Sequence, residues 1–218
     1  MKSILLIGLG RFGKQLARKL NEFGHDVLAI DSDEDRVNEI LPYIQNAEIG
    51  QVVNEAYILS LGVNNFDECI VAIGNNFQIS LEVTALLKDH GANHIISRAD
   101  SDSHAKLLLK VGADEIIYPE KDMANRLAVK LCSKSVIDYF QLTEHFSIYE
   151  IPVPKRWQGK SIGDLAIRTK YNVSVLATRK KDSEDLSPMP QADFVFGNED
   201  YIMVFGHNED VKKLVDSF

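Results

Sequence analysis

The chain has 218 residues, of which 45% are hydrophobic and 26% are charged, and its net charge is −8. This composition is ordinary for a globular protein with one large domain or two small ones. The negative charge disfavours nucleic acid as a partner. No apolar run reaches the roughly 20 residues needed to cross a bilayer, so we expect a cytoplasmic protein.

Strand-like and helix-like segments alternate along the first part of the chain. We expect strands at 3–8, 26–30, 46–49, 68–73, 94–97 and 115–118, with amphipathic helices near 12–23, 33–41, 54–61, 77–89 and 102–110. Strands that alternate with helices imply parallel crossovers. The predicted fold class is therefore α/β, a Rossmann-like doubly wound parallel sheet with a second, smaller α/β domain.

A different pattern begins after the sixth predicted strand. Apolar side chains recur every four residues between Ala124 and Phe140, which is typical of a helix at about 121–140 with a broad apolar stripe. This helix could pack on its own sheet or cross to a neighbouring subunit, and we favour the second. We include it in a first domain at 1–140.

The remaining residues predict a second domain at 145–218. The expected elements are strands at 146–153, 172–179 and 200–206 and helices at 161–167 and 208–217. A domain of this size has a marginal core when it stands alone. Pairing with a second copy is the usual remedy.

The stretch "ILLIGLGRFGKQLARKL" contains three glycines with the spacing G-x-G-x-x-G, directly after the first strand. Gly8 allows a tight turn, Gly10 allows backbone amides to approach a pyrophosphate, and Gly13 allows the helix to pack closely on the sheet. The amino terminus of the helix adds partial positive charge. The context therefore predicts a nucleotide site.

An acidic residue follows the second strand, where such sites hold the ribose. Asp31 lies 18 residues after Gly13, near the spacing expected for a carboxylate that binds ribose hydroxyls. A carboxylate here disfavours a 2′-phosphate, so the ligand is expected to resemble NAD or an adenine nucleotide rather than NADP. The alternative is that Asp31 caps the next helix, although "DSDED" offers other candidates for that role.

Arg11 lies inside the glycine turn, where phosphates would bind. A guanidinium can pair with phosphate oxygens through two hydrogen bonds. An added cation suits a highly charged ligand such as ATP or ADP, although it does not exclude NAD or NADH. The alternative is a surface arginine on the first helical turn.

Residues that could catalyse a reaction are scarce. Of the six histidines, only His104 is expected on the ligand side of the sheet, and no paired carboxylates, nucleophile elbow or metal-binding histidine spacing occurs. We therefore predict that the protein is not an enzyme. An NAD-dependent oxidoreductase and a ligand-binding module for some other partner are the alternatives.

Basic residues are concentrated in the second domain. Residues 155–181 contain eight lysines and arginines and a single acid, Asp164. This segment is either a solvated surface or an anion site.

Several stretches together resemble a known family, namely "IGLGRFG", "VLAIDSDEDRVNEI", "ECIVAIGNNFQIS", "GADEIIYPEKDMA" and "RTKYNVSVLATRK" with "LSPMP". The chain resembles a regulatory, gating subunit of a Trk/Ktr-type bacterial potassium uptake system, with RCK (regulator of potassium conductance) N-terminal and C-terminal (TrkA-C) domains. The resemblance implies dimers that assemble into a ring, commonly an octamer, beneath a membrane potassium-translocating subunit. It also implies that ATP and ADP compete for the N-terminal domain and change the shape of the ring, and that NAD or NADH can bind.

The resemblance also assigns residues to the nucleotide. By motif match, Gly8, Gly10, Arg11, Phe12 and Gly13 would surround the phosphates, and Asp31 would lie at the ribose. Asn75 and Arg98 would line the same crevice, and Ser32 would also belong to the nucleotide site. Members of the family often have a small residue, an acidic residue and a threonine after the third strand, where the protein contacts the adenine base. This chain has Gly50, Gln51, Val52 and Val53 instead.

Two further sites are implied by the resemblance alone. Glu120 would help to hold a divalent cation, Mg or Ca, beside the nucleotide, unless Glu120 and Asp122 only stabilise a helix amino terminus. Cyclic di-AMP would bind the C-terminal domain at a two-fold interface, unless these positions are only surface and dimer core. The phosphates would meet Arg168 and Lys170, and the bases would lie between Ile162, Asn172, Val173 and Pro188.

Overall fold

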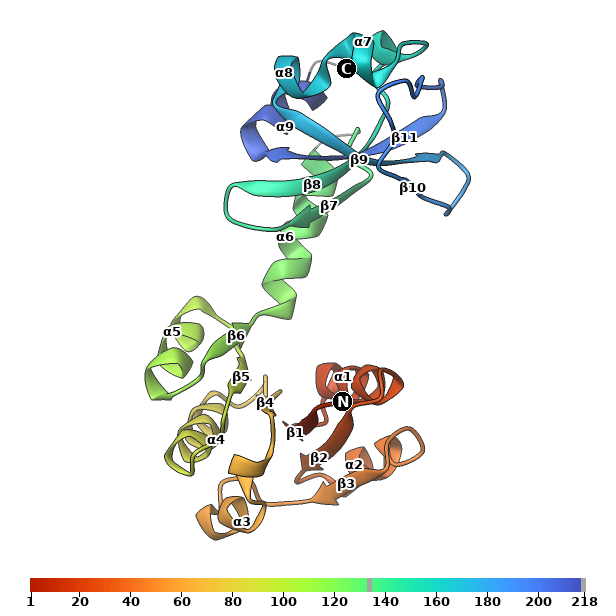
Figure 1. Ribbon diagram of the computed structural model, residues 1–218. Coiled ribbons are helices and arrows are strands. Elements are labelled where there is room, and N and C mark those ends of the chain that lie inside the picture. Colours follow the sequence, from red (N-terminus) through yellow and green to blue (C-terminus); the bar gives the residue numbers. More distant parts are fainter. Residues whose placement is uncertain (133–134, 217–218) are drawn as a thin grey trace. The chain divides into compact units, whose positions relative to one another are not determined.

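The computed structural model describes residues 1–132 and 135–216 and divides into two compact units, Met1–Glu120 and Lys121–Phe218 (Figure 1). Residues 133–134 and 217–218 lie outside the described residues. Residues 133–134 fall within the helix predicted at 121–140. Residues 217–218 fall within the predicted second domain, and residue 217 also ends the helix predicted at 208–217.

The first unit is built on a parallel sheet with the strand order β3-β2-β1-β4-β5-β6. Its strands are β1 Ser3–Ile7, β2 Asp26–Asp31, β3 Asn46–Ile49, β4 Glu68–Val71, β5 Ile95–Arg98 and β6 Glu115–Ile117. The order reverses between β1 and β4, which both lie at the centre of the sheet. The predicted Rossmann-like, doubly wound sheet is confirmed.

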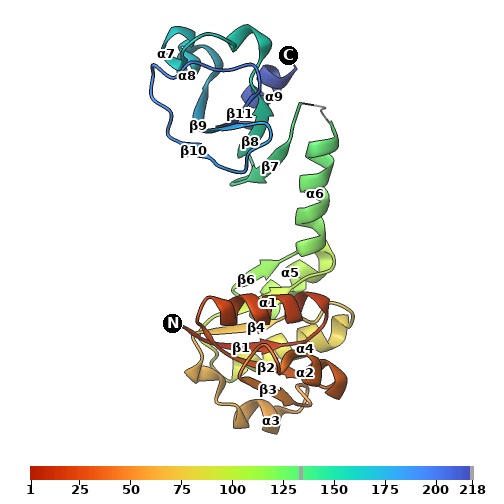
Figure 2. The same cartoon turned by 90° about the vertical axis from the view of Figure 1, so that its right-hand side faces the viewer.

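Helices cover both faces of this sheet (Figure 2). They are α1 Arg11–Glu22, α2 Glu34–Ile40, α3 Glu55–Ser60, the short 3-10 helix η1 Val63–Asn65, α4 Phe77–Asp89 and α5 Asp102–Val111. Helices α1 and α2 pack on one face of the sheet, over a first hydrophobic core, and α3 and α4 pack on the other face, over a second core. Alternate side chains of β1 enter these two cores. Ile4 and Leu6 contact the first, and Leu5 and Ile7 contact the second.

The glycine turn brings the start of α1 against the end of β1. Gly8 has a φ of +103°, a conformation that side chains with a Cβ rarely adopt. A Cβ on Gly13 would lie 1.9 Å from the carbonyl oxygen of Gly8, whereas a Cβ on Gly10 would meet nothing within 4 Å. Gly13 therefore serves the packing of α1, and Gly10 leaves open space at the helix amino terminus.

Helix α6 spans Pro119–Cys132, and the helix predicted at about 121–140 is wrong at 138–140; residues 133–134 of that prediction lie outside the described residues. Residues Asp138–Gln141 form strand β7, which pairs with β8 of the second sheet. The physical reason is that Val136 and Tyr139 are buried in the core of the second unit. This packing overrides a four-residue apolar spacing that also fits a helix.

Helix α6 has few contacts in this chain. None of its residues is buried, and Met123, Leu127 and Leu131 are 60%, 52% and 75% exposed. It is held to the second unit by Arg126, whose Nε and Nη2 donate to Asp138 at 3.0 and 2.6 Å. These hydrogen bonds lower the pKa of the Asp138 carboxyl below its ordinary value.

The second unit contains an antiparallel sheet with the strand order β10-β9-β11-β8-β7. Its elements are β7 Asp138–Gln141, β8 Phe146–Pro152, η2 Lys155–Trp157, α7 Ile162–Leu165, α8 Ile167–Tyr171, β9 Val173–Lys180, β10 Ser187–Pro188, β11 Asp200–His207 and α9 Asn208–Val215. The core includes the fully buried Trp157 and Phe196. Throughout the described part of the chain, no helix is long and apolar enough to span a bilayer.

Substituting Gly13 tests this account of the glycine turn. Gly13→Ala should lower the free energy of unfolding by about 1–3 kcal/mol, because the new methyl group overlaps the Gly8 carbonyl. Gly10→Ala is the control and should lose less than about 1 kcal/mol, since Gly10 only caps α1. Urea unfolding followed by circular dichroism measures both, and equal losses would contradict the assignment.

Candidate nucleotide-binding site

A cavity of about 850 Å³ lies at the carboxyl ends of the central strands, where the strand order reverses. Ligands of doubly wound proteins bind at this position. The predicted residues that line the cavity are Gly8, Gly10, Arg11, Phe12, Asp31, Ser32, Asn75, Arg98 and Glu120. Gly13 does not line it, because this glycine faces the Gly8 carbonyl instead.

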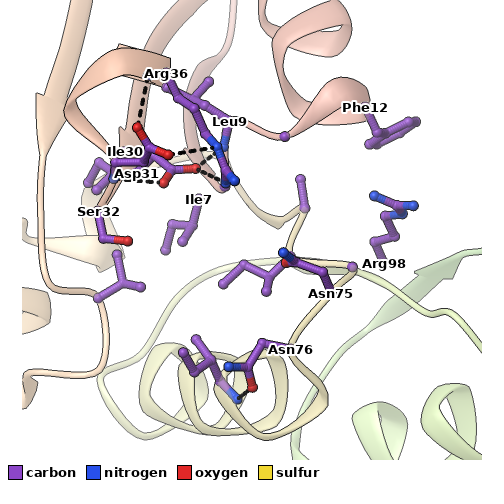
Figure 3. A pocket seen from close by; sticks show the side chains of 18 of the residues that line it. Ile7, Leu9, Phe12, Ile30, Asp31, Ser32, Arg36, Asn75, Asn76 and Arg98 are labelled. Carbon is purple, nitrogen blue, oxygen red and sulfur yellow. Dashed lines mark hydrogen bonds and ion pairs between the residues drawn. The ribbon is translucent and has the colours of Figure 1, made fainter.

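Asp31 connects the glycine turn to the end of β2 (Figure 3). Its side chain is 7% exposed, and its Oδ2 accepts a hydrogen bond of 2.6 Å from the backbone N–H of Leu9. Its Oδ1 accepts from the N–H of Asp33 at 3.0 Å. Asp33, and not Asp31, caps α2. The carboxylate is therefore free of the capping role and faces the cavity.

The sequence reasoning did not identify Arg36. Its Nη1 lies 3.4 Å from Asp31 Oδ2 and its Nε lies 3.2 Å from Asp33 Oδ2, and the residue lines the cavity. Lys14 also lines the cavity and pairs with Glu39. In the sequence, Lys14 and Arg36 look like ordinary surface charges of two amphipathic helices. Only the turn that brings α2 back beside Asp31 shows that they belong to the cavity.

Arg11 differs from the other cations of the cavity. Lys14, Arg36 and Arg98 each pair with a carboxylate. Arg11 is exposed and makes no ion pair or hydrogen bond to any residue that the structure describes. Its guanidinium is therefore available to an anion at the amino terminus of α1.

Phe12 and Arg98 lie across the pocket from Asp31 and Arg36 (Figure 3). The Arg98 guanidinium carbon is 5.7 Å from the centroid of the Phe12 ring, and Nη2 donates a hydrogen bond to Oε1 of Glu120. A Cβ on Gly74 would lie 2.6 Å from that guanidinium carbon, so the missing side chain leaves room for Arg98. The cavity thus has a carboxylate at one side and a paired arginine at the other.

The predicted metal role of Glu120 is not supported by a cluster of ligands. Within residues 1–132 and 135–216, no three His, Cys, Asp or Glu side chains lie close enough together to hold a metal ion. The Glu120 carboxylate is engaged by Arg98. The role of Glu120 in holding Mg or Ca beside a nucleotide therefore stays a prediction.

The segment after β3 lies beside Asp31, the predicted ribose-binding residue, although its residues depart from the family pattern. Gln51, Val52 and Val53 line the cavity, and the N–H of Gly50 donates to the backbone oxygen of Asp31 at 3.0 Å. A base joined to a ribose at Asp31 would therefore meet two valines and one amide. Apolar contact can hold any purine ring in such a position.

His104 is not placed for chemistry in this cavity. It is fully buried, its Nδ1 lies 3.0 Å from Asp100 Oδ1, and its ring packs against Phe77. It does not line the cavity. The histidine that the sequence singled out is thus part of the protein interior.

A second hollow, of about 340 Å³, lies in the second unit. Of the predicted cyclic di-AMP residues, Ile162 and Arg168 line it. Lys170, Asn172, Val173 and Pro188 do not. Val173 is 2% exposed in the core, and Pro190 lines the hollow where Pro188 was expected.

Comparison with known protein families assigns both units. A family model described as the TrkA-N domain matches residues 4–119, and one described as the TrkA-C domain matches residues 146–218. Among solved structures, the GsuK channel gives a TM-score of 0.70 at 19% identity over 98% of this chain. A GsuK channel bound to NAD gives a TM-score of 0.67 at 18% sequence identity, over 96% of this chain. The chain spans 38% of each channel chain, and the likeness concerns the fold alone.

Two curated relatives match along almost the whole chain. Ktr system potassium uptake protein C of Bacillus subtilis (strain 168) is 41% identical over 212 residues, which are 97% of this chain and 95% of that protein. Ktr system potassium uptake protein A of the same organism is 39% identical over the same shares. The chain therefore belongs to the TrkA-N/TrkA-C family of Ktr and Trk potassium uptake proteins.

Proposed function

We propose that this chain is a nucleotide-sensing regulatory subunit that gates a membrane potassium-translocating subunit. The observation that carries the proposal is the unpaired Arg11 in the glycine turn, within a cavity whose other described cations are paired. Relatives named as potassium uptake proteins support the transport role.

ATP and ADP fit the charge of this cavity best. The amino terminus of α1 offers backbone N–H groups to phosphate oxygens, as in other nucleotide-binding folds. A further phosphate needs a further cation, and Arg11 supplies one. NAD or NADH is the second candidate ligand, because Asp31 can bind a ribose in either case.

Gating requires that the ligands distinguish two conformations of the protein. A ligand shifts an equilibrium only by the difference between its affinities for the two states. ATP and ADP differ in one phosphate, so their different contacts with Arg11 would provide that difference. In this proposal the nucleotide dissociates without chemical change, so the protein acts as a sensor rather than as an enzyme.

The exposed stripe of α6 supports assembly with further copies. Met123, Leu127 and Leu131 are apolar and exposed in the single chain. Burial of such a stripe against a second copy is favourable. We propose dimers that assemble into an octameric ring on the cytoplasmic side of the membrane, attached through the potassium-translocating subunit.

Cyclic di-AMP is a second proposed regulator. The hollow that contains Ile162 and Arg168 has an arginine and apolar walls. Ala166, which also lines it, has a φ of +46°. Non-glycine residues in this conformation are strained and are common at ligand sites.

The first prediction concerns Arg11. Arg11→Ala should weaken ATP binding about 10-fold or more and ADP binding less, because the lost charge-assisted hydrogen bonds serve the added phosphate. Isothermal titration calorimetry measures both. Lys19→Ala, at the far end of α1, is the control and should change neither. Equal losses for the two nucleotides would refute the role of Arg11.

The second prediction concerns Arg168. Arg168→Ala should abolish cyclic di-AMP binding and leave ATP binding unchanged, because the two cavities lie in different units. Lys181→Ala removes an exposed charge from the same basic segment and serves as the control. Calorimetry with each ligand decides the matter. Unchanged cyclic di-AMP binding by Arg168→Ala would remove this site.

A further inference from the structure

The segment after β3 forms one end of the nucleotide cavity. Along the carboxyl edge of the sheet, neighbouring strands place the glycine turn after β1, Asp31 at the end of β2 and Gln51 after β3. A nucleotide with its phosphates at the glycine turn and its ribose at Asp31 would therefore extend its base toward Gln51. Gln51 lines the same cavity as the other two.

The backbone that carries Gln51 is held on both sides. The N–H of Gly50 donates to the backbone oxygen of Asp31 at 3.0 Å, and the backbone oxygen of Gln51 accepts from the N–H of Asn54 at 2.9 Å. The Asn54 side chain in turn caps α3. A Cβ on Gly50 would lie 2.3 Å from the Tyr57 hydroxyl, so this glycine lets the segment pack against α3. The protein itself therefore sets the position of residue 51 relative to Asp31.

The residues beside Gln51 offer an apolar surface to a base. Val52 and Val53 line the cavity and are 8% and 42% exposed. Ile79 of α4 also lines it. Apolar contacts hold adenine and guanine rings alike. The choice between the two bases therefore depends on polar groups at this end of the cavity.

The amide of Gln51 is the polar side chain that this segment offers. It is exposed and makes no hydrogen bond to any residue in the described part of the chain. The described carboxylates that line the cavity are Asp31, Asp33 and Glu120, which belong to other segments and each pair with an arginine. The base would therefore meet a neutral amide rather than a carboxylate.

An amide and a carboxylate differ in how they treat the two purines. Adenine carries an exocyclic amino group that donates a hydrogen bond, where guanine carries an oxygen that accepts one. A carboxylate accepts from the amino group and repels the oxygen. A glutamine amide has both a donor and an acceptor, and rotation about its terminal bond presents either one. Gln51 can therefore form a hydrogen bond with both bases.

We propose that the cavity accepts guanine nucleotides as well as adenine nucleotides, and that Gln51 is the residue that determines this tolerance. The inference rests on the proposed nucleotide-binding function and extends it to the choice of base. ATP and GTP have the same ribose and the same phosphates, so Asp31 and Arg11 treat them alike. The protein then senses the number of phosphates on a purine nucleotide, whichever base it carries.

Calorimetry on the full chain tests this proposal, with ATP and GTP titrated in the same buffer. The wild type should bind GTP within about fivefold of its ATP affinity, because neither base leaves the amide unpaired. Gln51→Glu replaces the amide with a carboxylate of the same size. It should raise the ratio of ATP affinity to GTP affinity about 10-fold, because the carboxylate repels the guanine oxygen. Both ligands carry the same phosphate charge, so the ratio reports the base alone.

Asn54→Asp is the matched control in the same loop. It also exchanges an amide for a carboxylate, but Asn54 does not line the cavity. Aspartate caps a helix as well as asparagine does, so α3 keeps its cap. The control should leave the ratio unchanged. Gln51 and Asn54 are both exposed, so neither variant should disturb folding, and thermal unfolding by circular dichroism checks this.

Three results would overturn the inference. The first is a wild-type affinity for GTP that is more than about fivefold below that for ATP. The second is an unchanged ratio in Gln51→Glu, and the third is an equal rise of the ratio in Asn54→Asp. Absence of ATP binding to the wild type would instead refute the proposed function, because the inference concerns only the choice of base.

Discussion

The hydrogen bond from the Leu9 N–H to the buried Asp31 carboxylate is the interaction on which the site depends. It joins the glycine turn after β1 to the end of β2, so the groups that would hold phosphates and ribose form one frame. Gly8 and Gly13 make this frame possible, because the turn needs a left-handed residue and α1 must approach the turn closely. The same carboxylate faces the cavity, where a ribose would bind.

The distribution of charge in the cavity is consistent with the proposed sensing of a ligand that is not chemically changed. Three of its cations are already neutralised by carboxylates, and Arg11 is open to a ligand. His104 is buried elsewhere, and the cavity therefore gains no proton donor from it. We propose that the binding energy in this site depends on the number of phosphates, which would let the protein distinguish ATP from ADP.

Local patterns predicted the sheet, the glycine turn and Asp31, because each depends on residues that are close in the sequence. They did not predict the Arg98–Glu120 pair, because only folding brings β5 beside the start of α6. Strand β7 was missed because its apolar spacing also fits a helix, and its partner strand decides the outcome. Arg36 looked like a surface charge, since its contact with Asp31 requires the turn between β2 and α2.

The central claim is that Arg11 reads the phosphate charge of a bound nucleotide. The most direct measurement is a pair of crystal structures of this protein, one grown with ATP and one with ADP. We expect the Arg11 guanidinium to contact the terminal phosphate of ATP and to take a different position with ADP. A guanidinium that points into solvent in both structures, with no other difference between them, would contradict the account.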